Sequence, residues 1–286
     1  MTFPITEMPV TAPFDTEGFE RRFGGLRRLY GPTAAQRVFD AHAVVVGVGG
    51  VGSWAAEAFA RSGVGRLTLI DMDHVGESNT NRQIHALDST LGQAKILAMR
   101  ERIAQINPWA RVDVVDDFVT PQNWSSLVES LKQDEQTLAV FDACDQVAAK
   151  VTMAAWALET GVLFVSAGAA GGKRLGHLVE VADLALTTHD PLLAQLRYRL
   201  RKHHGAARDG EIGVPCVFSR ESVAQPDASC VVPGEADGSL NCHGYGSSVG
   251  VTATFGLCAS GWLMDKLARG QTILKKKSRP LKTAKN

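Results

Sequence analysis

The stretch AVVVGVGGVGS, residues 43–53, decides the fold that we expect. Its β-branched residues predict a buried strand, and a turn containing Gly47, Gly49, Gly50 and Gly52 follows. The next segment, WAAEAFARSG, has the composition of a helix. Spaced glycines at such a junction permit a tight turn, a close approach of backbone to phosphate and close packing of the helix. The stretch therefore predicts a nucleotide-binding turn, although nicotinamide and flavin enzymes share the pattern.

Further short apolar runs recur along the chain, with helix-length segments between them. Strands that alternate with helices in this way predict a doubly wound, mostly parallel α/β sheet, that is, a Rossmann-like fold. The runs, including the first, cover residues 43–48, 67–70, 112–115, 138–141, 162–165 and 178–181.

The composition excludes some classes of protein, but it does not identify a binding partner. Of 286 residues, 45% are hydrophobic, and 30 basic residues balance 30 acidic ones, so any nucleic acid must be held by a local patch and not by overall charge. None of the five cysteines forms a C-x-x-C pair, which argues against a thiolate zinc site. The first twenty residues do not resemble a secretory signal, so we expect a cytoplasmic protein.

The amino-acid composition changes in the second half of the chain. Asp190 and Pro191 predict the cap and first position of a helix that ends at Gly205. Residues 206–246 are rich in Gly, Pro, Asp and Ser and predict a long, partly mobile loop over a site. The uncharged stretch 249–263 is shorter than the roughly 20 residues that span a bilayer, so we interpret it as a buried helix, with weak membrane association as the alternative.

A carboxylate ends the second strand about twenty residues after the glycine turn. Asp71 stands where the fold places a ribose ligand, and Asp73 follows it closely. The segments SNTNRQ and GQAK then supply Arg82 and Lys95. A triphosphate that is attacked at its α-phosphorus needs cations on the oxygens that leave, so this pair favours ATP over a dinucleotide. The competing interpretation is that both are ordinary surface side chains.

Two more carboxylates, Asp142 and Asp145, follow the strand at residues 138–141. The carboxyl ends of parallel strands form the crevice of such a sheet, and a carboxylate there can hold Mg²⁺ against phosphates. Alternatively, Asp142 caps the next helix.

Four ordered motifs, GVGGVGS, IDMDHVGESNTNRQ, GQAK and FDACDQ, together resemble the ubiquitin-activating-like superfamily, which includes the HesA, MoeB and ThiF proteins and adenylates carboxylates with ATP. The resemblance implies a ribose ligand, phosphate ligands, a Mg²⁺-binding acid and an arginine donated by the partner subunit of a homodimer. Asp71 matches the ribose ligand, and Asp145 matches the Mg²⁺-binding acid. Asn79, Arg82 and Lys95 match the phosphate ligands, with Gln83 beside them. Arg22 matches the donated arginine, and Arg21 is nearly as good a match.

Within that superfamily the chain is most similar to the tRNA threonylcarbamoyladenosine dehydratase family. The motifs RRFGGLRRLYG, SNTNRQIHAL, VVDDFVTPQN, HDPLLAQLRYRL, GVPCVFS and GVTATFG carry this resemblance. It implies that ATP activates the carboxylate of a modified adenosine beside the tRNA anticodon, after which a nitrogen of the same modification closes a ring and releases AMP. A cysteine desulfurase or sulfur-acceptor system is a further partner that the family suggests.

The resemblance divides the chain into four parts, and competing functions remain. We expect residues 1–40 to form an N-terminal arm and helix, 41–185 the ATP-binding adenylation domain, 186–270 the substrate-side helices and crossover-type loop, and 271–286 a basic disordered tail. The competing functions are adenylation of a sulfur-carrier or ubiquitin-like protein, a dinucleotide-binding redox protein, and a scaffold without turnover. Lack of the paired zinc cysteines of sulfur-carrier enzymes counts against the first of these.

Three further features are candidates for the substrate side. Cys242, followed by His243, is the best thiol candidate, with a thiol that takes no part in catalysis as the alternative. Two basic clusters are expected to hold the tRNA backbone, with solvated surface charge as the competing interpretation. They are Arg197, Arg199, Arg201 and Lys202, and the tail from Lys275.

Overall fold

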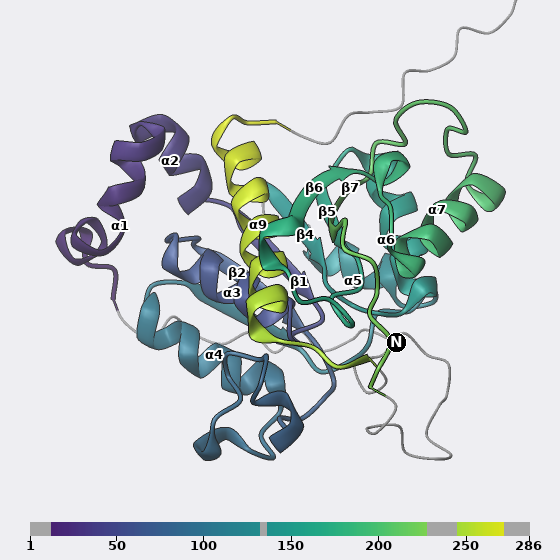
Figure 1. Ribbon diagram of the computed structural model, residues 1–286. Coiled ribbons are helices and arrows are strands. Elements are labelled where there is room, and N and C mark those ends of the chain that lie inside the picture. The colour runs from purple at the N-terminus through teal and green to yellow at the C-terminus, as the bar shows by residue number, and fades with distance from the viewer. Residues whose placement is uncertain (1–12, 132–135, 228–244, 272–286) are drawn as a thin grey trace, which may run out of the picture.

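A seven-stranded sheet organises the chain, and the computed structural model describes residues 13–131, 136–227 and 245–271 (Figure 1). The strand order is β3-β2-β1-β4-β5-β7-β6, with every neighbouring pair parallel except β6 and β7. This confirms the mostly parallel, Rossmann-like sheet predicted from the sequence. The strands are β1 (His42–Val46), β2 (Arg66–Ile70), β3 (Arg111–Val115), β4 (Leu138–Asp142), β5 (Leu163–Ala167), β6 (Val179–Asp183) and β7 (Pro215–Ser219).

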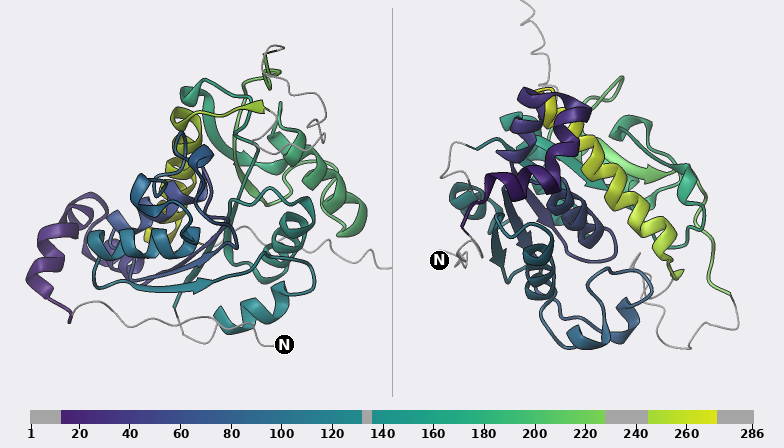
Figure 2. Two further views of the ribbon diagram at one scale, coloured as in Figure 1. Left: turned by 90° about the horizontal axis from the view of Figure 1, so that it is seen from below. Right: turned by 90° about the vertical axis from the view of Figure 1, so that its left-hand side faces the viewer.

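Helices cover both faces of the sheet (Figure 2). Helix α9 packs along α3 and across β5, β6 and β7, while α5 and α6 lie on the opposite side, joined by an edge-to-face contact of Trp124 with Trp156. Helices α1 and α2 form a hairpin at one end of the molecule. The helices are α1 (Thr16–Tyr30), α2 (Pro32–Phe39), α3 (Gly52–Arg61), α4 (Lys95–Ile106), α5 (Trp124–Leu131), α6 (Val147–Thr160), α7 (Pro191–His203) and α9 (Val249–Ala268), with short 3-10 turns at Glu77–Asn79, Asp88–Thr90, Gly176–Leu178 and Leu184–Leu186.

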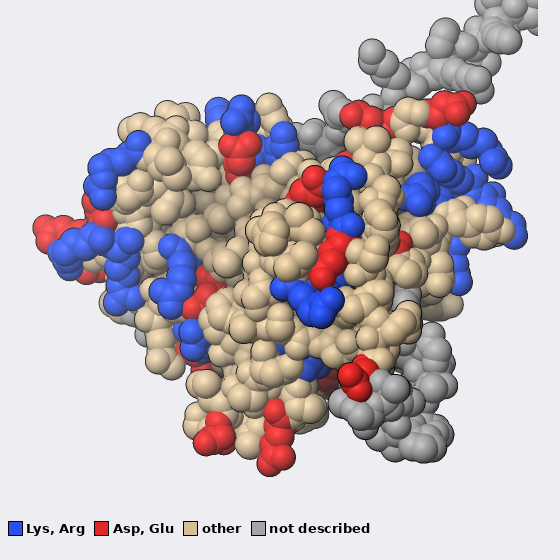
Figure 3. Space-filling view, in the orientation of Figure 1, with Lys and Arg blue, Asp and Glu red and all other residues tan. Residues whose placement is uncertain are grey.

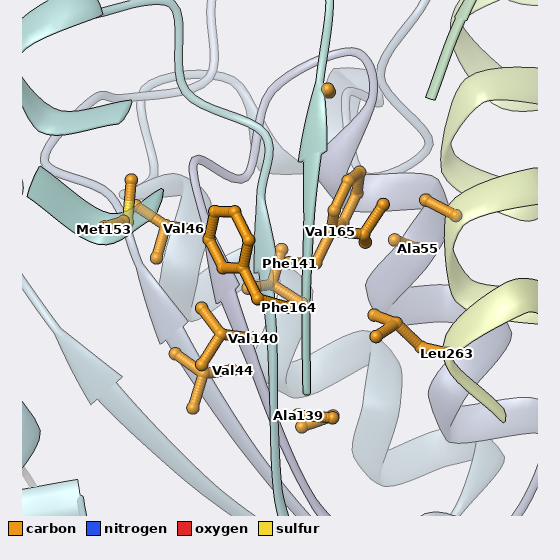
Figure 4. Close-up of a cluster of buried hydrophobic side chains, with 14 of the residues drawn as sticks. Val44, Val46, Ala55, Ala139, Val140, Phe141, Met153, Phe164, Val165 and Leu263 are labelled. Carbon is orange, nitrogen blue, oxygen red and sulfur yellow. The ribbon is translucent and has the colours of Figure 1, made fainter. Parts of the chain in front are cut away.

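The central strands are buried on both faces, which explains their unbroken apolar runs. Val44, Phe141 and Phe164 are fully buried, and Figure 4 shows Ala55 and Leu263 on one side of these strands with Met153 on the other. The order reverses between β1 and β4, whose helices leave to opposite faces. At such a reversal the carboxyl ends of the two strands flank a crevice, which is where an open α/β sheet binds ligands.

Residues 206–246 do not form one long loop as the sequence predicted. Pro215–Ser219 is strand β7, which lies between β5 and β6 and turns the sheet antiparallel at its edge. The run is only five residues long and is surrounded by Gly and polar residues, so its strand character depends on pairing with chain segments far away in the sequence. The remainder of the predicted loop, residues 228–244 with Cys242 and His243, lies outside the described residues.

Helix α7 begins as predicted. The Asp190 side chain caps it by accepting from the Leu193 N–H (3.0 Å), and its second oxygen accepts from Ala169 N–H (2.9 Å), just beyond the end of β5. Burial raises the pKa of this carboxyl, partly offset by those N–H bonds and by the charge of Lys173. The start of α7 is thereby tied to the carboxyl edge of the sheet.

Helix α9 contains the uncharged stretch 249–263 and packs one face on α3 and the sheet, so the expectation of a buried helix is met only in part, because Val249 (44%) and Leu257 (49%) are exposed. Gly256 faces α3, and a Cβ there would lie 2.9 Å from Trp54 Cβ and 3.0 Å from the Ala55 nitrogen. By contrast, Gly261 on the same helix has open space around it. Within the described part of the chain, no helix combines the length and the apolar character needed to cross a bilayer.

We expect Gly256→Ala to lower the free energy of unfolding by about 1–3 kcal/mol, because the added methyl group forces α9 away from α3. The matched variant Gly261→Ala gains helix propensity in open space and should be stabilised by about 0.5–1 kcal/mol. Urea unfolding of both variants measures the difference. Equal effects of the two substitutions would contradict the close contact between α9 and α3.

Candidate active site

The glycine turn connects β1 to α3 at the strand-order reversal. Gly47 adopts φ +86°, which favours glycine, and its N–H donates to the Ile70 carbonyl (2.8 Å). A Cβ on Gly47 would lie 3.0 Å from the Ala143 carbonyl carbon, and one on Gly52 would collide with the Gly47 carbonyl. No side chain caps α3, so the positive end of its helix dipole is open to an anion, although the Ser53 N–H donates to the Gly49 carbonyl (3.1 Å).

Asp71 clamps this turn from the end of β2. One of its oxygens accepts from Val48 N–H (2.6 Å), and the other accepts from Asp73 N–H (2.9 Å). Burial raises the pKa of Asp71, while the charge of Lys95 and the two N–H bonds oppose that rise. The carboxylate that the sequence assigned to a ribose therefore also fixes the shape of the turn.

Lys95 is the first residue of α4 and is only 6% exposed. Its Nζ lies 2.7 Å from Asp73 Oδ2, and its backbone N–H donates to the Asp73 carbonyl (3.0 Å). A buried ammonium is costly unless it is paired, and this pairing holds it beside the end of β2. The structure thus excludes the interpretation of Lys95 as an ordinary surface side chain.

Arg82 and Gln83 reach the same turn from the segment after the 3-10 turn Glu77–Asn79. A Cβ on Gly50 would lie 3.2 Å from Arg82 Cγ, so the arginine stem lies over the glycines, and the guanidinium donates to Ser78 O (2.6 Å) and Asn81 Oδ1 (2.9 Å). Gln83 is buried with no partner for its Oε1 among the described residues. An unpartnered buried amide oxygen beside an anion site marks a position that a ligand or water completes.

Other elements hold this segment in place. The Arg82 carbonyl accepts from Trp54 Nε1 on α3 (3.0 Å) and from Thr252 Oγ1 on α9 (3.4 Å). Asn79 accepts from the Gly76 N–H through its side-chain oxygen (3.0 Å), which fixes the preceding turn. The sequence did not point to Trp54 or Thr252, since their role depends on α9 crossing α3.

The two carboxylates after β4 have different environments. Asp142 is fully buried, accepts from Lys150 Nζ (3.0 Å) and Ser166 Oγ (2.6 Å), and also accepts from the Cys144 N–H (3.2 Å). Asp145 is exposed, and the Gln146 side chain donates to it at 3.4 Å. Asp142 is therefore committed to an internal ion pair, and Asp145 alone of the two faces solvent.

Asp142 does not cap α6, contrary to the alternative weighed from the sequence, because Gln146 occupies the cap position. It instead binds Lys150, four positions inside α6, and the turn that leads to Asp145. Lys150 was missed by the sequence analysis. The one available signal was a lysine placed among alanines and valines, in AAKV, on a helix with few other polar residues.

Arg22 lies apart from these residues within one chain. Its guanidinium donates to the Ile106 carbonyl (2.8 Å) and is 5.3 Å from the centre of the Trp109 ring. It lines an open cavity of about 800 Å³ together with His85, Arg61 and Arg102. Arg21 is exposed and pairs with Asp15 and Glu17.

The basic cluster on α7 is only partly exposed. Arg197 and Arg201 donate to backbone carbonyls, whereas Arg199 and Lys202 are exposed. The second predicted cluster, from Lys275, lies outside the described residues.

The crevice thus gathers an uncapped helix N-terminus, Asp71, two cations and an exposed carboxylate. A model of the ThiF family matches residues 22–257. The chain belongs to the ThiF family. Its turn and cations are the features that the sequence resemblance was based on, and the match extends over nearly the whole described chain.

Similar proteins of known name agree with this assignment. The chain is 45% identical over 260 residues to the tRNA threonylcarbamoyladenosine dehydratase of Escherichia coli K12, covering 88% of this chain and 95% of that protein. It is 38% identical over 276 residues to the Haemophilus influenzae protein of the same name, covering 95% and 100%. These matches confirm the resemblance to the dehydratase family inferred from the sequence.

Solved structures of the Escherichia coli enzyme share the fold. The complex with AMP has a TM-score of 0.79 and 43% identity, covering 91% of this chain and 99% of that one. The complex with ATP has a TM-score of 0.78 and 43% identity, covering 90% and 98%. In those complexes AMP and ATP are bound to a protein whose structure matches this chain almost from end to end.

We expect Lys150→Met to lower the free energy of unfolding by about 3–5 kcal/mol, because it leaves the Asp142 charge buried without its partner. The double variant Lys150→Met with Asp142→Leu removes both charges and should recover a large part of that loss. Urea unfolding with a circular dichroism signal compares the two. A double variant as unstable as the single one would show that the buried pair is not the source of the cost.

Proposed function

We propose that this ThiF-family chain uses ATP to activate the carboxylate of threonylcarbamoyladenosine beside the tRNA anticodon, and then closes a ring on that modification. One combined observation carries the proposal. The crevice contains an anion site and two cations, and the chain is similar over nearly its full length to enzymes named for this substrate. In the first step the carboxylate oxygen attacks the α-phosphorus, and pyrophosphate leaves. In the second a nitrogen of the modification attacks the acyl carbon, and AMP leaves.

The residues of the crevice have separate tasks in the first step. The N–H groups at the start of α3 bind phosphate oxygens, and Asp71 binds the ribose. Lys95 exchanges its contact with Asp73 for the phosphates, and Arg82 approaches them from above Gly50. Both cations stabilise the charge that develops on departing pyrophosphate, which is the interaction that lowers the barrier. Asn79 and Gln83 shape and complete the pocket.

Magnesium fits the exposed carboxylate after β4. Mg²⁺ keeps several waters and needs only one or two carboxylates besides phosphate oxygens, and Asp145 supplies one. Among the described residues no group of three or more His, Cys, Asp or Glu side chains gathers into a dedicated metal cage. When bound, the ion would neutralise phosphate charge beside Asp145.

Ring closure does not require a protein nucleophile, because a nucleophile on the same modification already has a high effective concentration. The described cysteine nearest the crevice, Cys144, is unsuited to attack, since burial and the adjacent Asp142 raise its pKa well above the usual value. The chain's part in this step is to hold the adenylate and exclude water. Cys242, which lies outside the described residues, stays a candidate thiol.

A second copy of the chain is the partner that we assign to the cavity beside Arg22. His85 lines this cavity with 1% exposure, and neither ring nitrogen has a partner among the described residues. Burial and the charges of Lys95 and Arg102 lower its pKa to about 4, so it is neutral and still needs a hydrogen bond. In a symmetric homodimer the same surface serves both copies, and Arg22 of each enters the other's phosphate site.

The remaining assignments follow the chain order. Residues 41–185 bind ATP, residues 186–270 face the tRNA, and the N-terminal helix of residues 1–40 supplies the arginine in trans. Because the proposed substrate is a tRNA, we propose that the protein works in the cytoplasm.

Incubation of the purified chain with ATP and threonylcarbamoyladenosine-containing tRNA should release AMP and pyrophosphate, and the tRNA nucleoside should lose the mass of one water. Lys95→Ala and Arg82→Ala should each lower the rate by about 100-fold or more, because a preorganised charge is removed from a developing anion. Circular dichroism confirms that each variant is folded. Adenylation of a carrier protein C-terminus in place of the tRNA would overturn the assignment of substrate.

Complementation tests the donated arginine. Arg22→Ala and Lys95→Ala are each expected to be nearly inactive, because every site lacks one cation. In an equal mixture, half of the dimers are mixed, and one of their two sites has both cations, so about a quarter of the parent activity should return. Mixing two portions of the Lys95→Ala chain is the control. No recovery in a mixture shown to exchange subunits would sink the arrangement in trans.

A further inference from the structure

A stripe of basic and aromatic side chains runs along the exposed face of α7. Ala194, Arg197, Tyr198, Arg201 and Lys202 have the spacing i, i+3, i+4, i+7 and i+8 that brings residues onto one helical face. The opposite face is buried through leucines. The spacing gathers these side chains on one face, so that three cations and an aromatic ring lie close together.

Two of the arginines are fixed in position without losing charge. Arg197 Nη1 donates to Leu184 O (2.9 Å), Thr187 O (3.1 Å) and Thr187 Oγ1 (2.8 Å). Arg201 donates to the carbonyls of Ala207 (3.0 Å) and Arg208 (3.1 Å). A guanidinium has five N–H donors, so each keeps donors for an anion. Carbonyl partners orient the groups, and only a carboxylate would cancel their charge.

No carboxylate of the described residues pairs with the cations of this stripe. Figure 3 shows Lys and Arg gathered over the α7 side of the molecule, on the right of the view. The whole chain has no net charge, so this concentration is local. Such a patch attracts a polyanion, and its affinity should depend steeply on salt.

The stripe borders a hollow of about 410 Å³, which Arg208 closes from the following loop. Tyr198 lines it and is 61% exposed, with Lys202 Nζ 5.5 Å from the centre of its ring. An exposed aromatic ring among cations is the arrangement by which proteins stack unpaired bases and hold the adjoining phosphates. The hollow offers one aromatic ring and no broad apolar face for a bilayer to bury, so its lining favours a nucleotide over a membrane.

The hollow lies at a distance from the crevice that a large substrate can bridge. Asp190 ties the start of α7 to the end of β5, and Tyr198 is eight residues further on, which is about 12 Å along a helix. An RNA stem-loop is larger than this span.

We infer that this hollow binds the tRNA substrate through an unpaired nucleotide, whose base stacks on Tyr198 while its phosphates contact Arg201, Lys202 and Arg208. This rests on the proposed function, and it refines the expectation from the sequence: Arg197 serves mainly to hold the 184–187 segment, and Tyr198 and Arg208, which the sequence analysis did not select, join the surface.

Anisotropy of labelled tRNA with the full chain tests the assignment. Tyr198→Ala should weaken binding by about 5- to 100-fold, which corresponds to the loss of one stacked base, and Tyr198→Phe should bind like the parent. Lys202→Gln with Arg208→Gln should lower the slope of log affinity against log salt by about 0.7–0.9 for each phosphate that is no longer neutralised. Arg269→Gln, at the C-cap that follows α9, removes one exposed charge elsewhere and is the control. In turnover assays KM for tRNA should rise, with kcat and ATP binding unchanged.

The outcomes separate this inference from the function on which it rests. If the parent chain releases no AMP with tRNA, the proposed function fails. If the parent is active and Tyr198→Ala binds and processes tRNA as the parent does, the hollow is not the tRNA surface. Binding of anionic phosphatidylserine vesicles that Tyr198→Ala abolishes, without a change in tRNA affinity, would overturn the inference in favour of a membrane.

Discussion

The rest of the structure depends on how closely the backbone can approach itself at the start of α3. Gly47 lies against the Ala143 carbonyl, Gly52 against Gly47, and Gly256 of α9 against α3. A side chain at any of these positions would separate two elements that the crevice needs together. Because the contacts involve backbone atoms, the turn after β1, the turn after β4 and helix α9 form one closely packed unit around the N-terminus of α3.

Charge is distributed around this unit in two ways. Asp142 and Lys150 neutralise each other where no water reaches, and their bonds fix the turn that leads to Asp145. Lys95 lies nearly buried but has a partner, Asp73, that is exposed and can release it. A fully buried pair is structural because breaking it leaves an unpaired charge, whereas a pair at the rim can be exchanged for a ligand. Burial therefore distinguishes the Asp142–Lys150 pair, which holds the fold, from the Asp73–Lys95 pair at the rim, which can be exchanged.

The sequence alone was enough to predict those features that depend on neighbouring residues. The glycine turn, the carboxylate at the end of β2 and the cap of α7 by Asp190 each follow from a few consecutive residues, and the structure contains them all. It was not enough to predict features that depend on contacts between residues far apart in the sequence. Strand β7 is a short run that becomes a strand only between β5 and β6, and Lys150 meets Asp142 only when α6 packs on the sheet. The site residues could be selected from motifs, but their supports, Trp54 and Thr252, could not.

The hydrogen bond from Thr252 to the Arg82 carbonyl also has a consequence for how the chain folds during its synthesis. Thr252, which binds the Arg82 carbonyl, is made 170 residues after it. At about 5–20 residues per second, a ribosome needs roughly ten to thirty seconds between the two. During that interval α9 does not yet exist, so the face of α3 that it covers has no packing partner. The apolar surface left exposed on a nascent chain of this kind is prone to aggregate until α9 covers it.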